Sequence, residues 1–241
     1  MTSAIKRIPF HDYEVARINL KTYKHQPGQK LINTINAYSY VVAEEDEEFK
    51  KALQASDLLL PDGFPIVWAV KRFCNEQIFK IAGADIHQYL LEKANKEALK
   101  VFYLGSMPST LEAIGERIGR VYPNVTFSCF SPPYKPVFSD EDNRQMLDAV
   151  NAFKPDILFV GMTAPKQEIW SYRHKDSLDT GVICSIGAVF DFYAGTVKRA
   201  PAWMIKLRLE WFFRLVKEPK RMWRRYLVYS PRFFRYVLQK K

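Results

Sequence analysis

The sequence predicts an α/β protein built on a Rossmann-like parallel sheet with helices on both faces. Short apolar segments alternate with amphipathic stretches through the second half of the chain, as expected when strands and helices follow one another in a parallel sheet. Proline-rich turns such as SPPYKP separate some of these segments. With 241 residues, 48% of them hydrophobic, the chain is long enough to bury a sizeable core and to carry an appendage.

The expected elements follow in order along the chain. Residues 1–30 mix charges with short apolar pieces and predict no element. The expected apolar strands lie at residues 31–35, 58–60, 99–105, 124–130, 156–161 and 181–187. The expected helices lie at residues 37–55, 64–73, 84–95, 108–121, 139–153 and 165–175.

Three polar loops follow strands in this scheme. They are NTIN at 33–36, PDGF at 61–64 and GMTAPKQE at 161–168. Ligands of doubly wound sheets lie beyond the carboxyl ends of the strands, so these loops are where a site is expected. The glycine-rich fingerprint of dinucleotide-binding sheets is absent, which argues against a nicotinamide-dependent oxidoreductase.

Asp62 is the carboxylate whose position is most informative. It directly follows an apolar strand and stands between Pro61, which fixes φ, and Gly63, which permits unusual backbone geometry. A carboxylate there is placed to accept a proton from a substrate hydroxyl. The alternative is a cap for the helix that starts near Phe64, and the two roles are compatible.

The GMTAPKQE loop places Lys166, Gln167 and Glu168 in the first turn of a helix that follows a strand. Gly161 lets a ligand approach the backbone, and a helix amino terminus attracts a phosphate. Lys166 would add a positive charge. The alternative is an ordinary capped turn with a solvated polar face.

Nothing in the sequence indicates a metal centre or another cofactor. There is no HExxH motif and no Cys-His cluster, and the three cysteines are widely spaced, as expected of reduced thiols in a cytosolic protein. Asp191 differs from the other acids because apolar residues surround it in GAVFDFYAGT. A buried acid needs a partner, which gives Asp191 a structural or a functional role.

The carboxy-terminal segment is basic and aromatic. Residues 198–241 hold 14 lysines and arginines against two acids, so residues 1–197 carry about −2 of the total +10. Apolar residues recur there at four-residue spacing and predict one helical stripe, formed by Trp203, Leu207, Trp211 and Leu215. Pro219 should break or restart the helix. The expected basic face comprises Arg214, Lys217, Arg221, Arg224 and Arg225.

This pattern favours an anionic membrane surface over nucleic acid as the partner, because aromatic and basic side chains together suit a bilayer interface and no nucleic-acid-binding motif is present. No signal peptide and no membrane-spanning segment is expected. An adaptor without enzymatic activity, bound to a membrane or a nucleic acid through this segment, is the alternative function. A homo-oligomer that covers the apolar stripe until membrane contact is also compatible with the sequence.

The ordered set of motifs resembles the WecG/TagA/CpsF glycosyltransferases, glycosyltransferase family 26. The resemblance runs from Leu31 to Leu227 through NTIN, LLLPDG, GAD, VFYLG, ILFVGMTAPKQE, GAVFDFYAGTVKRAP and LEWFFRLVKEPKRMWRR. It implies a metal-independent inverting enzyme at the cytoplasmic face of the bacterial membrane. Such an enzyme moves a sugar from a UDP-sugar to an undecaprenyl-diphosphate-linked sugar, in teichoic acid or exopolysaccharide synthesis. The change in composition near Thr196 predicts two domains, an α/β core at 1–195 and a basic aromatic appendage at 196–241.

The resemblance also implies roles for particular residues. Asp62 would be the base, and Thr34, Asn36 and Gly63 would line the same pocket. The other implied substrate contacts are Lys80, Asp85, Lys166, Gln167, Glu168, Asp191, Arg214, Arg221 and Arg224, the three arginines holding the diphosphate. Lys80 stands where relatives commonly have an arginine, and Met162 and Thr163 stand where small residues are frequent. The donor sugar is therefore left open among N-acetylmannosamine, its uronic acid and a hexose.

Overall fold

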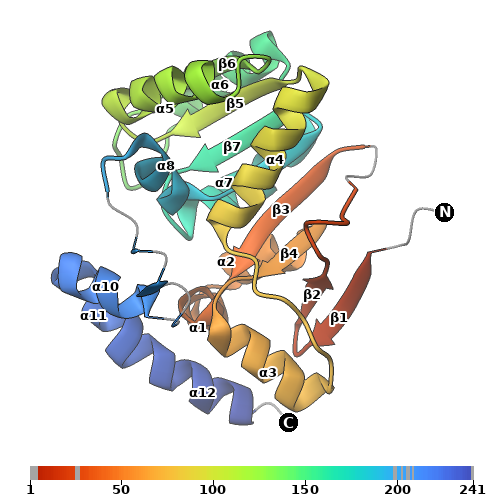
Figure 1. The fold of residues 1–241 in the computed structure, drawn as a ribbon, viewed down its shortest axis with the longest axis vertical. Coiled ribbons are helices and arrows are strands. Elements are labelled where there is room, and N and C mark those ends of the chain that lie inside the picture. The colour runs from red at the N-terminus through yellow and green to blue at the C-terminus, as the bar shows by residue number, and fades with distance from the viewer. Residues whose placement is uncertain are drawn as a thin grey trace.

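A computed structural model of the chain describes residues 5–24, 28–197, 200–201, 203–204, 207 and 209–239. Its centre is an eight-stranded sheet in the order β1-β2-β4-β3-β8-β7-β5-β6 (Figure 1). The strands are β1 Lys6–Phe10, β2 Tyr13–Arg17, β3 Lys30–Ile35, β4 Leu58–Pro61, β5 Lys100–Gly105, β6 Thr126–Phe130, β7 Ile157–Gly161 and β8 Val182–Ser185. Only the β1–β2 pair is antiparallel, and the other pairs are parallel. The α/β class expected from the sequence is therefore confirmed.

Helices cover both faces of this sheet. The helices of the α/β part are α1 Ala37–Glu45, α2 Glu47–Gln54, α3 Phe64–Cys74, α4 Gly83–Glu97, α5 Pro108–Val121, α6 Asp140–Phe153, α7 Lys166–His174, the short 3-10 helix η1 Lys175–Ser177, and α8 Gly187–Ala194. One buried cluster joins the sheet to α4, α5 and α8, and another joins the opposite face to α6 and α7. These clusters bury the apolar sides of the helices whose amphipathic pattern was visible in the sequence.

Strands β1 and β2 form a hairpin that the sequence did not reveal. Ile8 and Phe10 of β1 face Val15 and Tyr13 of β2 in an antiparallel register, and all four side chains are buried. Each strand has only five residues, and charges alternate with the apolar positions. The hairpin is stable here because its apolar side packs against α1, α2 and α3 in a third buried cluster.

Two helical segments differ from their predicted form. The stretch expected as one helix at 37–55 is divided at Asp46, whose carboxylate accepts hydrogen bonds from the backbone N–H groups of Glu48 and Phe49 and so caps α2. The last expected strand ends at Ser185 rather than at residue 187, because Gly187 already begins α8. Helix α8 was not predicted, since its sequence is apolar almost throughout and shows no helical periodicity.

The carboxy-terminal segment ends in a helical run. Its elements are α10 Glu210–Lys217, α11 Pro219–Trp223, the π-helix η2 Arg224–Tyr229 and α12 Ser230–Gln239. Pro219 occupies the first position of α11, as expected for a proline that restarts a helix. The prediction of one helical stripe through Trp203, Leu207, Trp211 and Leu215 was wrong, because Leu207 lies in a turn and α10 begins only at Glu210. Figure 1 shows these helices beyond one end of the sheet, beside α1 and α3.

Helix α12 is anchored in the core. Phe233 and Val237 are fully buried in the cluster that also holds side chains of α1 and α3. The ring of Phe233 meets the ring of Tyr40 edge to face, with centroids 5.2 Å apart. The π-helix before it has a local cause, since Pro231 lacks the N–H that would bond to the carbonyl of Leu227 in an α-helix.

Candidate active site

The sheet order brings four polar strand ends together. Strands β4, β3, β8 and β7 are neighbours, so the residues that follow them meet at one edge of the sheet. The helices after β7 and β8 lie on opposite faces, which makes this edge a topological switch point. The three loops predicted from the sequence therefore meet at this edge, with the start of α8 as a fourth member.

The β3 and β4 ends lie side by side. Ile35 pairs with Pro61 in register, and the backbone N–H of Asp62 donates to the carbonyl of Ile35 at 2.8 Å. Asp62 and Thr34 are both partly exposed. Helix α3 starts at Phe64, and its cap position is Gly63 at φ 92°, a conformation that glycine adopts without strain. Asp62 therefore precedes the cap position by one residue.

Asn36 caps the amino terminus of α1 at this edge. Its side-chain oxygen accepts from the backbone N–H of Ser39 at 3.0 Å, while the Ser39 hydroxyl accepts from the backbone N–H of Asn36 at 2.8 Å. This capping box fixes the start of α1. The amide nitrogen of the Asn36 side chain takes no part in the capping box.

The segment with Lys80 and Asp85 reaches the same edge. The backbone N–H of Ile81 donates to the carbonyl of Pro61 at 2.9 Å, which places the segment beside the end of β4. Lys80 is exposed, and the carboxylate of Asp85 accepts from the backbone N–H of Ala82 at 2.8 Å to cap α4. A Cβ at Gly83 would lie 3.1 Å from the side chain of Val189 and 3.3 Å from that of Ile186, so the start of α4 lies close to the start of α8.

Gln167 is enclosed by the protein rather than open to solvent. Its side-chain oxygen accepts from the backbone N–H of Gly187 at 3.0 Å and from that of Met162 at 3.3 Å. Its amide nitrogen donates to the carboxylate of Glu168 at 2.8 Å. Both ends of the amide are thus engaged, and Gln167 joins the loop after β7 to the first turn of α8.

Glu168 is a buried ionisable group of the site. Its side chain lies in the interior, and one carboxylate oxygen has no hydrogen-bond partner among the described residues. Burial raises the pKa of the Glu168 carboxyl to about 7, against the opposing effects of the Gln167 hydrogen bond and the positive charge of Arg225. This carboxyl therefore changes its charge near neutral pH.

The side chain of Lys166 points away from those of Gln167 and Glu168. Its ammonium donates to the backbone carbonyl of Lys135 and lies 3.4 Å from the centroid of the Phe138 ring. Burial lowers the pKa of Lys166, and the charge of Asp142 opposes this shift. The side chain thus packs on the connection between β6 and α6 rather than beside Gln167.

Asp191 and Arg214 lie at α8. Asp191 is partly exposed rather than buried, and its backbone carbonyl accepts from the hydroxyl of Thr196 at 3.0 Å. The guanidinium of Arg214 lies 5.4 Å from the centroid of the Phe192 ring. Its Nε and Nη2 atoms are buried without a hydrogen-bond partner in the described part of the chain. A buried cation with open donors is a binding element for an anion.

The other two predicted arginines are placed differently. Arg224 is exposed and lies over the ring of its neighbour Trp223 at 5.4 Å. The side chain of Arg221 lies outside the described residues, although its backbone belongs to α11. Arg225 was assigned to the basic face but not to the site. Its guanidinium lies 4.2 Å from the centroid of the Tyr38 ring on α1.

Three neighbours of the predicted site residues were not singled out from the sequence as part of the site: Gly187 beside Gln167, Arg225 near Glu168, and Tyr38 under the Arg225 guanidinium. Arg225 lies in the π-helix, whose wider turn places side chains where a 3.6-residue period does not. Gly187 was read as the end of a strand. The one available signal was the pair of glycines in GVICSIGAVF, which permits a close backbone approach.

Comparison with known proteins gives a consistent result. The model of the glycosyl transferase WecG/TagA/CpsF family matches residues 3–241. Two relatives, from Bacillus subtilis strain 168 and Bacillus spizizenii, are each 31% identical over 229 residues, covering 94% of this chain and 87% of theirs. A relative from Staphylococcus aureus strain MW2 is 28% identical over 208 residues, covering 86% of this chain and 80% of its own. All three are named N-acetylglucosaminyldiphosphoundecaprenol N-acetyl-beta-D-mannosaminyltransferase.

Proposed function

The chain belongs to the WecG/TagA/CpsF family of glycosyltransferases, and from this membership we propose that it transfers a sugar from a UDP-linked donor to a polyprenyl-diphosphate-linked N-acetylglucosamine. The names of the relatives point to N-acetylmannosamine as the transferred sugar. The observation that carries the proposal is the meeting of the β4, β3, β8 and β7 ends at one switch point. It gathers Asp62, Asn36 and Gln167 from three distant parts of the sequence.

Asp62 is the proposed base. In the reaction a hydroxyl of the acceptor sugar attacks C1 of the donor sugar while the bond from C1 to the UDP oxygen breaks. UDP leaves with the bonding electron pair, and the carboxylate of Asp62 takes the hydroxyl proton. Attack on the face opposite the leaving group inverts the configuration at C1. Asp62 suits this role because it is partly exposed at the end of β4.

The departing diphosphate requires positive charge. We propose that arginines of the appendage, rather than a metal ion, supply it through bidentate hydrogen bonds to phosphate oxygens. Arg214 is favoured by its buried donors without a partner among the described residues. Arg221 and Arg224 are proposed to act with it, on the resemblance alone.

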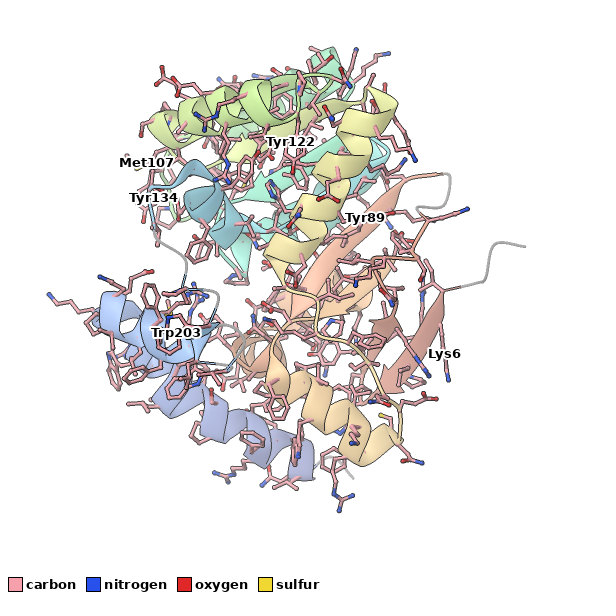
Figure 2. The ribbon with its side chains drawn as sticks, in the orientation of Figure 1. Lys6, Tyr89, Met107, Tyr122, Tyr134 and Trp203 are labelled. Carbon is pink, nitrogen blue, oxygen red and sulfur yellow. The ribbon has the colours of Figure 1, made fainter. Side chains whose placement is uncertain are left out.

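Association with the cytoplasmic face of the membrane is the third part of the proposal. Large apolar side chains are exposed along the appendage, among them Trp203, Leu207, Trp211, Phe212, Val216, Trp223 and Leu227. Figure 2 shows Trp203 among the side chains around α10. Basic residues lie between them, which is the composition of a segment that rests in a bilayer interface. Within the described residues, no helix is long and apolar enough to cross a membrane.

The test is an assay of UDP release. The protein is mixed with UDP-N-acetylmannosamine, its uronic acid or UDP-glucose in turn, with polyprenyl-diphosphate-N-acetylglucosamine in liposomes and with EDTA. We expect release with one donor only, dependent on the acceptor and insensitive to EDTA. If folded protein released no UDP with any of the three donors, the proposed reaction would be rejected. Activity that EDTA abolishes would reject only its metal independence.

A further inference from the structure

We infer that Glu168 is a positioning residue: its buried carboxylate orients the side-chain amide of Gln167, so that Gln167 ties the loop after β7 to the first turn of α8. The inference rests on the proposed function where it concerns turnover. Under this inference Glu168 contacts Gln167 and not the substrate, whereas the family resemblance led us to expect a substrate contact.

The hydrogen bonds around Gln167 allow one orientation of its amide. The oxygen faces two backbone donors, the N–H groups of Gly187 and Met162, and the nitrogen faces the Glu168 carboxylate. In the opposite orientation the amide hydrogens would point at N–H donors and the amide oxygen at a carboxylate. Glu168 therefore selects the orientation that holds the two loops together.

The close approach of the Gln167 side chain to the backbone requires a glycine at position 187. A Cβ at Gly187 would lie 2.3 Å from the side-chain oxygen of Gln167, so any other residue there would displace the amide. The amide and the carboxylate are both buried, 5% and 3% exposed, where water cannot replace a lost partner. The contact lies at the switch point and joins the loop after β7 to the start of α8.

The appendage also acts on this carboxylate. The positive charge of Arg225 favours the charged form of Glu168 and so opposes the rise in its pKa that burial causes. Arg225 is itself stacked on Tyr38 of α1. The guanidinium of a residue in η2 thus acts on the Glu168 carboxyl, which links the appendage to the hydrogen bonds around Gln167.

The test is a double-mutant cycle with Glu168→Ala, Gln167→Ala and the double variant, alongside Glu168→Gln. If Glu168 acts through Gln167, each single alanine variant lowers kcat by roughly tenfold to a hundredfold, and the double variant is no worse than the poorer single one. Glu168→Gln keeps an acceptor oxygen for Gln167, so it should retain kcat within about threefold of the wild-type value.

Two results would overturn the inference. Losses in kcat that multiply in the double variant, or a Glu168→Gln variant as impaired as Glu168→Ala, would mean that Glu168 acts on the substrate independently of Gln167. The same cycle measured by urea unfolding needs no substrate, and independent effects there would likewise reject the coupling. If the wild-type protein released no UDP, the proposed function would fail while the unfolding cycle still decided the role of Glu168.

Discussion

Asp62, Arg214 and Glu168 are three ionisable side chains in or beside one site, and they differ in how far they are buried. Asp62 is partly exposed, Arg214 has two buried nitrogens, and Glu168 is enclosed. Charge withdrawn from water is costly unless it is paired, so such groups are candidates for function. Each gives a separate expectation for substitution.

Replacement of the Asp62 carboxylate should separate binding from chemistry. Asp62→Asn keeps the shape of the side chain but removes the base, so kcat should fall by about a hundredfold or more while the donor KM changes little. UDP release over a range of donor concentrations measures both constants. Near-native turnover by the folded variant would exclude Asp62 as the base.

Arg214 should show opposite effects on stability and on activity. Arg214→Met removes buried donors that lack a partner in the described chain, so the free energy of unfolding should stay the same or rise. Turnover should fall by about a hundredfold, because a donor to the departing diphosphate is lost. Arg214→Lys keeps the charge without the fork and should be intermediate. Loss of stability with full turnover would assign Arg214 to the fold instead.

Glu168 should make the stability of the protein depend on pH. Its pKa is about 7 in the folded chain, against a usual 4.5, so the folded state keeps a proton that the unfolded chain has released. The free energy of unfolding should therefore fall between pH 4.5 and 7, by an amount on the order of 3 kcal/mol. Urea unfolding at pH 5 and pH 8 should show this fall in the wild type and a smaller one in Glu168→Gln. Parallel pH profiles would contradict the assignment.

At the scale of elements, α12 belongs to the core although it lies at the end of the basic segment. Phe233 and Val237 are buried with side chains of α1 and α3, and Arg232 pairs with Glu45 of α1. The division into domains at 1–195 and 196–241 stays a prediction. The packing shows that the last helix shares a hydrophobic cluster with the α/β part.

Truncation of Phe233 should therefore destabilise the whole chain. Phe233 is 0% exposed and Phe234 is 37% exposed, so the neighbouring position offers a control with the same chemical change. Phe233→Ala should lower the free energy of unfolding by about 3–5 kcal/mol, and Phe234→Ala by less than half as much. Equal effects in urea unfolding would mean that α12 is not anchored as described.

At the scale of the whole molecule, charge and exposed apolar surface are concentrated in the appendage. The basic residues of 198–241 outweigh the slightly acidic remainder, and exposed tryptophans and leucines lie among them. Figure 2 places Trp203 in the appendage, away from Met107 and Tyr134 in the connections that follow β5 and β6. One region of the molecule thus combines the features expected of a membrane contact.

Vesicle binding should depend on this region. The protein should sediment with phosphatidylglycerol vesicles more than with phosphatidylcholine vesicles, and added salt should weaken the difference. A Trp223→Ser, Leu227→Ser double variant should bind about tenfold less, because two exposed apolar side chains are lost. Val121→Ser on α5 is the control for an exposed apolar residue elsewhere. If the control variant lost as much vesicle binding, the appendage would have no specific role in membrane contact.

The sequence by itself determined which segments are strands and helices in most of the α/β part, where the chain turns, and which family the ordered motifs resemble. These are local properties, because periodicity, prolines and glycines act over a few residues. Two elements were not predicted. The hairpin of β1 and β2 is stabilised by burial against elements far away in the sequence. Helix α8 is apolar almost throughout, so its sequence shows no helical periodicity.

Only the tertiary structure decided how the motifs meet. The order β4-β3-β8-β7 is set by contacts between residues far apart in the chain, and it alone makes Gln167 a neighbour of Gly187. Lys166 and Glu168 are two residues apart, yet the side chain of Lys166 packs on the β6–α6 connection and that of Glu168 lies in the interior. A side chain's role follows from the donors, acceptors and charges that the fold assembles around it, and no local pattern contains those.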